Sequence, residues 1–276
     1  MIHFDFAYAR PENLREAVEE FASAHAAGLH PVYYAGGTEL LTFGRTGRIR
    51  PGVVIDVKGI PECRRLGIDG EEIVFGAALS LSEVIRANLF PLLSLAATGV
   101  ADHTVRNRLT LGGNIAGQLP YREAVLPFLV AEARFRFEGP AGSRSLSASE
   151  AFDKRLLRSE EELLVEVRVQ RDMAQLPFFH RRHERGGRID YPLVSLCLAR
   201  KGEEIRFAVS GAHGFPLRVH EAGSLLADPS LPAAERADRF VASLAVPIRE
   251  DFRASAAYRR HLLQASIAEG LTALGG

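Results

Sequence analysis

The sequence predicts an α+β protein with two linked α/β units and a smaller α+β domain at its C-terminus. An amphipathic helix and two short apolar strands make residues 1–57 typical of a β-α-β unit. Hairpin and helix patterns alternate over residues 58–170. Beyond Gln170 long strands precede polar helices, so we expect one domain over residues 1–170 and a second over residues 171–276.

In the first unit, apolar residues at helical spacing predict a helix over residues 11–27. Pro11 suits its first position and Gly28 follows its end. Two apolar stretches, residues 32–35 and 53–57, predict buried strands. A glycine-rich stretch follows the first of these strands.

The second unit opens with a predicted hairpin, because Asp69-Gly70 separates two short apolar runs. Ser80 and Glu83 have the spacing of a capping box, which predicts a helix through Ala87. Further patterns predict helical segments at residues 91–101, 124–131 and 149–152, and strands at residues 134–138 and 162–169.

The C-terminal domain is predicted to hold three strands backed by helices. The strands are expected at residues 193–200, 204–211 and 218–219, and the helices at residues 233–244 and 254–273. A run rich in Arg and His, residues 179–188, precedes them and is typical of a solvated face or loop. One or two of its members could still face a site.

The composition is that of a globular protein: of 276 residues, 47% are apolar and 25% are charged. With 34 basic and 34 acidic residues the net charge is zero, which argues against nucleic acid or an anionic membrane as partner. The two cysteines, Cys63 and Cys197, lack metal-binding spacing, which argues against an iron–sulfur cluster or structural zinc in this chain. Because no leader pattern or membrane-length apolar run is found, we expect a cytoplasmic protein.

Two glycine stretches stand out, Tyr34–Leu41 and Thr110–Ala116. Each has a Gly-Gly pair beside Thr and a polar residue, Glu39 or Asn114. Glycine permits φ > 0 and close approach of a ligand, and successive amides form an anion-binding nest. One such stretch alone is more often a plain turn, and neither matches the dinucleotide or P-loop patterns. Two of them in one chain predict either a long ligand with two phosphates or one pyrophosphate held from both sides.

Other polar residues could complete this site. Glu123 follows the second stretch and could accept hydrogen bonds from a ribose, although capping the next helix is the better interpretation on its own. Tyr191 could cover a ring system, while His103 is interpreted as a local hydrogen-bonding residue. The sequence shows no nucleophile elbow, metal-ligand spacing or Ser-His-Asp set. It therefore predicts a protein that holds a cofactor, which does the chemistry.

Both glycine stretches resemble the FAD loops of one known family, the FAD-binding (medium) subunits of molybdenum hydroxylases of the xanthine dehydrogenase and carbon monoxide dehydrogenase type. Val105-Arg106-Asn107 and Phe4-Asp5-Phe6 fit this family, and Asp251–His261 resembles its C-terminal signature. The resemblance covers nearly the whole chain. It implies a two-subdomain FAD-binding fold of the vanillyl-alcohol-oxidase type, with subdomains of about 1–57 and 58–170, followed by a small α+β domain.

The resemblance also implies which residues hold FAD. One side of the pyrophosphate would contact Ala35, Gly36, Gly37, Thr38, Glu39 and Leu40, and the other side Thr110, Gly112, Gly113 and Asn114. Glu123 stands where the family usually has an Asp that binds the ribose. His180 or Arg181 falls near the place of a lysine beside the flavin, and Asp190 and Tyr191 match the place where the chain passes the isoalloxazine ring.

Members of this family work with a small subunit that carries two [2Fe–2S] clusters and a large subunit that carries the molybdenum cofactor. The resemblance thus implies a relay of electrons from those clusters through FAD to NAD⁺ or another acceptor. Two alternatives remain: a stand-alone NAD(P)H-dependent flavin reductase, and a scaffold that has lost its flavin, which only the departures at Glu123 and His180 favour. The sequence names neither the substrate nor the final acceptor.

Overall fold

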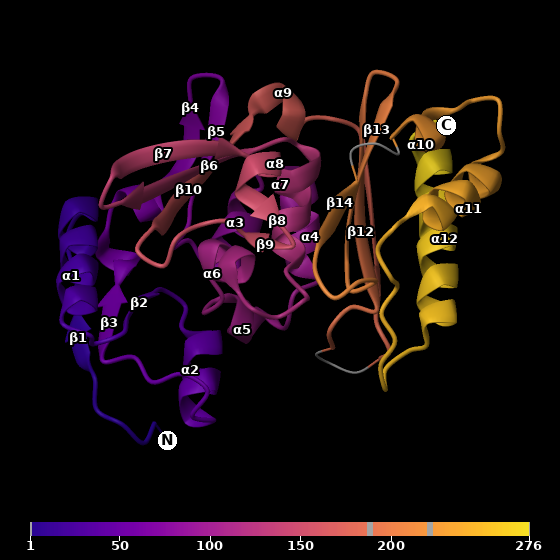
Figure 1. Ribbon diagram of the computed structural model, residues 1–276. Helices are drawn as coiled ribbons and strands as arrows, with labels where there is room; N and C mark the ends of the chain where they lie inside the picture. Colours follow the sequence, from indigo (N-terminus) through magenta and orange to yellow (C-terminus); the bar gives the residue numbers. More distant parts are fainter. Residues whose placement is uncertain (1, 187–189, 220–222, 276) are drawn as a thin grey trace.

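A computed structural model describes residues 2–186, 190–219 and 223–275. Besides a two-stranded hairpin at residues 152–156, three larger sheets follow one another along the chain, and the last of the three packs against the long C-terminal helix (Figure 1). The mixture of helices and strands confirms the predicted α+β class. Among the described residues, no helix is both long and apolar enough to cross a bilayer.

The strands are β1 (Ala7–Ala9), β2 (Pro31–Tyr34), β3 (Val53–Asp56), β4 (Leu66–Asp69), β5 (Glu72–Gly76), β6 (Arg134–Gly139), β7 (Gly142–Ser147), β8 (Phe152–Asp153), β9 (Arg155–Leu156), β10 (Leu163–Gln170), β11 (Phe178–His183), β12 (Val194–Lys201), β13 (Glu204–Ser210) and β14 (Leu217–Val219). The helices are α1 (Leu14–Ala26), α2 (Thr38–Arg45), α3 (Leu81–Ala87), α4 (Pro91–Thr98), α5 (His103–Arg106), α6 (Leu111–Ala116), α7 (Leu126–Val130), α8 (Ala148–Ala151), α9 (Arg171–Ala174), α10 (Gly223–Ala227), α11 (Ala233–Ser243) and α12 (Ala256–Ala273). Single turns of 3-10 helix lie at Val57–Gly59, Glu62–Arg64 and Glu123–Val125.

The first sheet is parallel, in the order β1-β3-β2, and α1 packs its apolar face against it. This agrees with the predicted β-α-β unit, although β1 was not predicted. Helix α1 begins at Leu14 rather than Pro11, because the Asn13 side chain accepts the Glu16 amide and so caps the helix three residues later. Gly28 ends it with φ of 72°, as a helix C-terminus favours.

The second sheet is antiparallel, in the order β4-β5-β10-β6-β7. The hairpin at Asp69-Gly70 and the reciprocal capping box of Ser80 and Glu83 are confirmed. Helix α4 ends at Thr98 and not at 101, with Gly99 as its C-cap. Strand β7 was missed because its sequence, Gly-Ser-Arg-Ser-Leu-Ser, has a single large apolar residue and pairs at an open edge.

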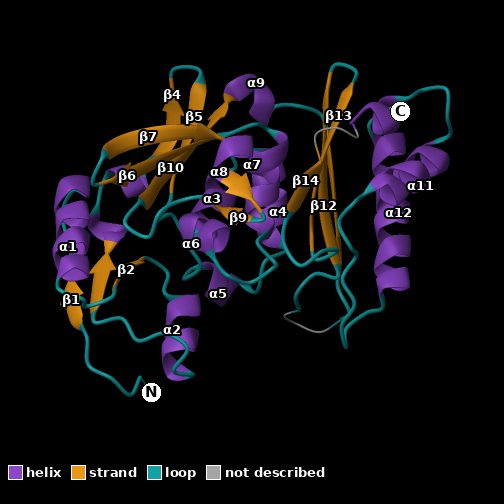
Figure 2. Cartoon of the chain, in the orientation of Figure 1, coloured by secondary structure: helices purple, strands orange, loops and turns teal. Residues whose placement is uncertain are grey.

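The third sheet has four antiparallel strands, β11-β12-β13-β14, and α11 and α12 cover one face (Figure 2). The prediction of three strands was wrong, because β11 falls in the Arg- and His-rich run. Residues 179–183 of that run lie in this edge strand, and their polar side chains have specific partners: Arg181 pairs with Glu269, and His183 lies 2.8 Å from the Ser266 hydroxyl. Gly187 and Arg188 of the run lie outside the described residues.

A buried ion pair joins the third sheet to the 3-10 turn before α7. Arg182 of β11 donates from Nε to Glu123 Oε1 at 3.0 Å, and the Glu123 side chain is only 2% exposed. Glu123 itself begins the 3-10 turn that leads into α7, which packs on β12 and β13. The domain limits of 1–170 and 171–276 stay a prediction.

We expect Glu123→Ala to lower the free energy of unfolding by about 3 kcal/mol, because it removes one partner of a buried ion pair. The matched change is Glu269→Ala, which breaks the exposed pair with Arg181 and should cost less than about 1 kcal/mol. Urea unfolding of both variants measures the difference. Equal losses would show that the buried pair contributes no more to stability than the exposed one.

Candidate cofactor-binding site

A cleft of about 710 Å³ runs along strand β2 and past both glycine stretches. Strand β2 is an edge strand of its sheet. The opposite side of the cleft is formed by the start of β10 and by the segment that precedes β10. The volume lies within the range of small-molecule and cofactor sites. Nine of the residues predicted to bind the cofactor line it: Ala35, Gly36, Gly37, Thr38, Glu39, Leu40, Thr110, Gly112 and Gly113.

The first glycine stretch presents free amides to this cleft. Gly37 takes φ of 70° and starts α2 without a side-chain cap, and the first helical hydrogen bond runs from Leu41 N to Gly37 O at 2.8 Å. In the part of the chain that the structure describes, none of the amides of residues 36–40 donates a hydrogen bond. A helix N-terminus with free amides attracts anions, so this stretch suits a phosphate.

The second glycine stretch is different, because its amides are used within the protein. Leu111 N donates to Leu79 O and Gly112 N to Ala77 O, both at 2.8 Å. The Thr110 side chain then caps α6 by accepting the Gly113 amide at 3.2 Å. Of the two nests expected from the sequence, the structure therefore forms one. The second stretch offers a ligand the hydroxyl of Thr110 and the exposed face of Gly113.

The two stretches touch each other directly. A Cβ atom on Gly36 would overlap the carbonyl oxygen of Arg108, just before the second stretch. Just after the second stretch, the Glu39 carboxylate accepts hydrogen bonds from the amides of Gln118, at 2.9 Å, and Leu119, at 3.2 Å. Gly36 is thus required for packing, and Glu39 clamps the two stretches together.

Further along the cleft, two aromatic rings stack near the guanidinium group of Arg158. The Phe21 and Tyr33 rings stack with their centroids 4.7 Å apart, and Tyr33 Oη donates to Glu161 O at 2.9 Å. Burial raises the pKa of Tyr33 and lowers the pKa of Arg158, which donates to the backbone carbonyls of residues 159, 160 and 162. The sequence did not single out Tyr33 or Arg158 as site residues, since neither belongs to a motif.

Three of the predicted site residues, Asn114, Glu123 and His180, lie outside the described lining of this cleft. Asn114 Oδ1 accepts the Ala124 amide at 3.1 Å and so ties α6 to the turn after it. Burial raises the pKa of Glu123, although Arg182 and Ser195 oppose this. His180 Nε2 lies 3.3 Å from the Ser195 hydroxyl. Contacts of these side chains with FAD stay predictions.

Asp190 and Tyr191 are also outside the lining, and arginines hold them in place. Arg253 pairs with the Asp190 carboxylate and donates to Tyr191 O, while Arg182 donates to Asp190 O at 2.6 Å. The Tyr191 ring stacks on Tyr121 with centroids 4.6 Å apart. This segment is therefore rigidly fixed against the loop that follows α6, and its predicted place beside a flavin stays a prediction.

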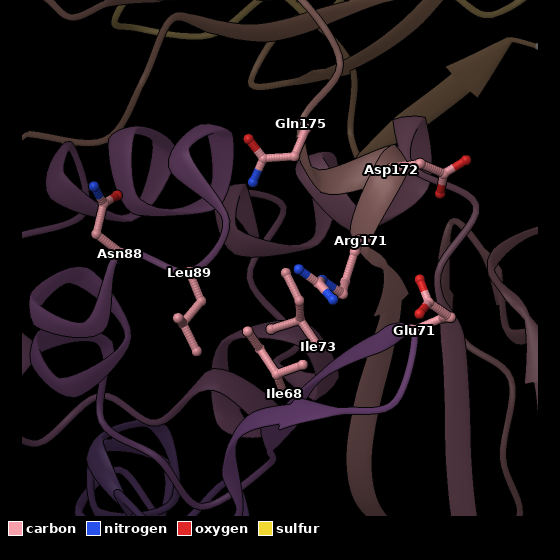
Figure 3. Close-up of a pocket in the computed structure, with 8 residues that line it drawn as sticks. All are labelled: Ile68, Glu71, Ile73, Asn88, Leu89, Arg171, Asp172 and Gln175. Atoms are coloured by element: carbon pink, nitrogen blue, oxygen red, sulfur yellow. The ribbon is translucent and has the colours of Figure 1, made fainter.

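A second hollow of about 500 Å³ lies between the β4–β5 hairpin, the end of α3 and helix α9 (Figure 3). Ile68, Ile73 and Leu89 form its apolar part. Its polar groups, such as Arg171 and Asp172, are exposed to solvent. Its described lining contains neither glycine stretch.

Comparison with known proteins identifies the class of this chain. The family described as the FAD binding domain in molybdopterin dehydrogenase matches residues 4–170, and the chain belongs to this family. It is an FAD-binding medium subunit of the molybdenum hydroxylase type, an oxidoreductase subunit with FAD as its cofactor. The resemblance seen in the sequence is confirmed, and the open helix amides beside the cleft fit a cofactor with a pyrophosphate.

Particular relatives support this. The carbon monoxide dehydrogenase medium chain of Hydrogenophaga pseudoflava is 36% identical over 176 residues, which cover 61% of this chain and 60% of that relative. The xanthine dehydrogenase FAD-binding subunit of Escherichia coli O157:H7 is 26% identical over 294 residues and 99% of both chains. The solved structure of the Hydrogenophaga pseudoflava carbon monoxide dehydrogenase matches with a TM-score of 0.87 at 28% identity, covering 100% of this chain and 99% of that one.

We expect Gly36→Ala to weaken FAD binding and to destabilise the protein by about 1–3 kcal/mol, because its methyl group forces the two glycine stretches apart. Gly214→Ala is the matched control, since a Cβ there meets nothing within 4 Å. Urea unfolding and FAD titration of both variants test this. A Gly36→Ala protein that behaves like Gly214→Ala would contradict the close contact.

His180 should make stability depend on pH. Burial and the charges of Arg182 and Arg181 lower its pKa from 6.5 to about 4, so it is neutral in the folded protein at pH 5. The unfolded chain takes up a proton there, so stability falls as the pH drops from about 6.5 towards 4. Urea unfolding at pH 7.5 and pH 5 should show a smaller loss for His180→Gln than for the wild type. An equal loss would mean that His180 is not the group responsible.

Proposed function

We propose that this chain carries electrons within a heteromeric molybdenum hydroxylase, from [2Fe–2S] clusters on a small subunit through FAD to NAD⁺ or another acceptor. A large subunit with the molybdenum cofactor would supply the electrons. The observation on which the proposal rests is the cleft with its uncapped α2 N-terminus, because it gives an FAD pyrophosphate a place between two subdomains. The relatives named above are a medium chain and an FAD-binding subunit of dehydrogenases.

Within this proposal the described residues bind and orient the cofactor. The amides of residues 36–40 would meet one side of the pyrophosphate, and Thr110 with Gly113 the other. The stacked Phe21 and Tyr33 rings would pack against a ring at one end of the cleft. Bound FAD supplies the ability to take electrons one at a time and to exchange a pair as hydride. For Glu123, His180, Asp190 and Tyr191 we retain a role near the ribose or flavin as part of the proposal.

The test begins with the purified full chain and added FAD. We expect one flavin to bind, with an absorbance maximum near about 450 nm, and anaerobic NADH to bleach it if NAD⁺ is the acceptor. The same titration is repeated on the complex with its partner subunits. Substrate of the complex should then bleach the flavin without NADH.

The possible results separate the alternatives. Turnover of NADH with a small acceptor by the isolated chain, as fast as in the complex, would favour a stand-alone flavin reductase. A colourless chain that still joins the partner subunits would establish a scaffold. Flavin that binds but is never reduced by the substrate of the complex would contradict the proposed relay.

A further inference from the structure

A lysine outside the cleft holds the open glycine stretch in shape. The chain contains three lysines, at positions 58, 154 and 201, and Arg supplies nearly all other positive charge. Lys58 lies two residues beyond the end of β3, in the 3-10 turn that follows it. Because β2 runs parallel to β3 with Tyr34 beside Asp56, Lys58 lies next to the point where β2 passes into the glycine stretch.

The Lys58 ammonium group has an acceptor for each of its three protons. Nζ lies 2.7 Å from both carboxylate oxygens of Asp56 and 3.1 Å from the carbonyl oxygen of Ala35. It also lies 4.2 Å from the centroid of the Tyr34 ring. A compact ammonium with three donors fits this arrangement, whereas the flat guanidinium of Arg would not reproduce it.

The Asp56 carboxylate, which binds the Lys58 ammonium group, is itself held by other contacts. Asp56 is 4% exposed, and its carboxylate also accepts the Tyr8 hydroxyl at 2.5 Å and the Lys58 amide at 3.0 Å. These bonds come from β1 and from the turn after β3, so the carboxylate is fixed by the first sheet. Although burial raises it, hydrogen bonds from Lys58 and Tyr8 bring the pKa of Asp56 below its usual value. The carboxylate therefore stays charged at neutral pH.

The contacts of Lys58 continue into the cleft. The Tyr34 ring that it faces packs against Gly37, where an added Cβ would overlap the ring. Gly37 is the N-cap of α2 with φ of 70°, and the residues whose amides stay free line the cleft. Ala35, Tyr34 and Gly37 all line the cleft, but Lys58 and Asp56 do not. Lys58 thus acts on two points of the glycine stretch, a carbonyl group and a ring.

We propose that Lys58, held by Asp56 and Tyr8, is a positioning residue that keeps the Tyr34–Gly37 segment in the conformation that binds the cofactor pyrophosphate. This inference rests on the proposed site in the cleft. Without Lys58 the Ala35 carbonyl and the Tyr34 ring lose their common anchor. The segment then samples other conformations, and cofactor binding has to select the competent one.

The test compares Lys58→Met with Lys154→Met in the full chain. Lys154 also places its ammonium near an aromatic ring, 5.4 Å from the Phe215 centroid, but does not line the cleft. We expect Lys58→Met to raise the dissociation constant for FAD about tenfold, as the loss of one charge-assisted hydrogen bond predicts. Lys154→Met should leave it unchanged. Lys58→Arg should fall between the wild type and Lys58→Met, because it keeps the pair with Asp56 and loses the Ala35 contact.

Amide hydrogen exchange of the flavin-free protein gives an independent readout. The amides of residues 41–45, which are hydrogen-bonded within α2 from the Leu41 N to Gly37 O bond onward, should exchange several-fold faster in Lys58→Met than in the wild type or Lys154→Met, while α12 stays unchanged. If the wild type takes up no flavin, the proposed function fails, and this exchange measurement still decides the role of Lys58. Unchanged exchange at residues 41–45, or equal effects of Lys58→Met and Lys154→Met on FAD binding, would overturn the proposal.

Discussion

The contact between the two glycine stretches is the constraint on which the rest of the structure depends. Gly36 packs against the backbone at Arg108, and Glu39 binds the amides of Gln118 and Leu119. These contacts join residues about seventy to eighty positions apart, one from the parallel sheet and one from the antiparallel unit. A side chain at Gly36 would push the two glycine stretches apart, and the cleft that both of them line would lose its shape.

The two stretches look alike in the sequence and have different physical roles. The second is a capped helix start: Thr110 and two backbone carbonyls, of Ala77 and Leu79, use its amides. The first leaves its amides free, which costs the protein about the stability that a helix cap contributes, on the order of 1 kcal/mol. An uncapped helix start beside a cleft is consistent with a site that an anionic ligand completes.

Much of the fold could be predicted because it depends on local patterns. The hairpin at Asp69-Gly70 and the capping box at Ser80 and Glu83 need only neighbouring residues, and both were placed correctly. Strand β11 could not be predicted, because its charged side chains find their partners far away in the chain, at Glu123 and Glu269. Position in the sequence likewise could not show which glycine stretch has free amides, since the acceptors lie on another segment.

Glu123 stands where the resemblance leads one to expect an Asp, and the structure gives a reason for the longer side chain that the motifs alone do not. Its carboxylate meets Arg182 across the junction with the third sheet, and Glu is one methylene longer than the Asp expected there. Arg182 in turn donates to the Asp190 carbonyl, and Tyr191 returns to stack on Tyr121, two positions before Glu123. The segment after α6 thus contacts both β11 and the Asp190-Tyr191 segment, and Arg182 takes part by binding Glu123 and the Asp190 carbonyl. Because α7, which follows directly on Glu123, also packs on β12 and β13, these polar contacts lie at the edge of an apolar contact and fix how the third sheet meets the loop after α6.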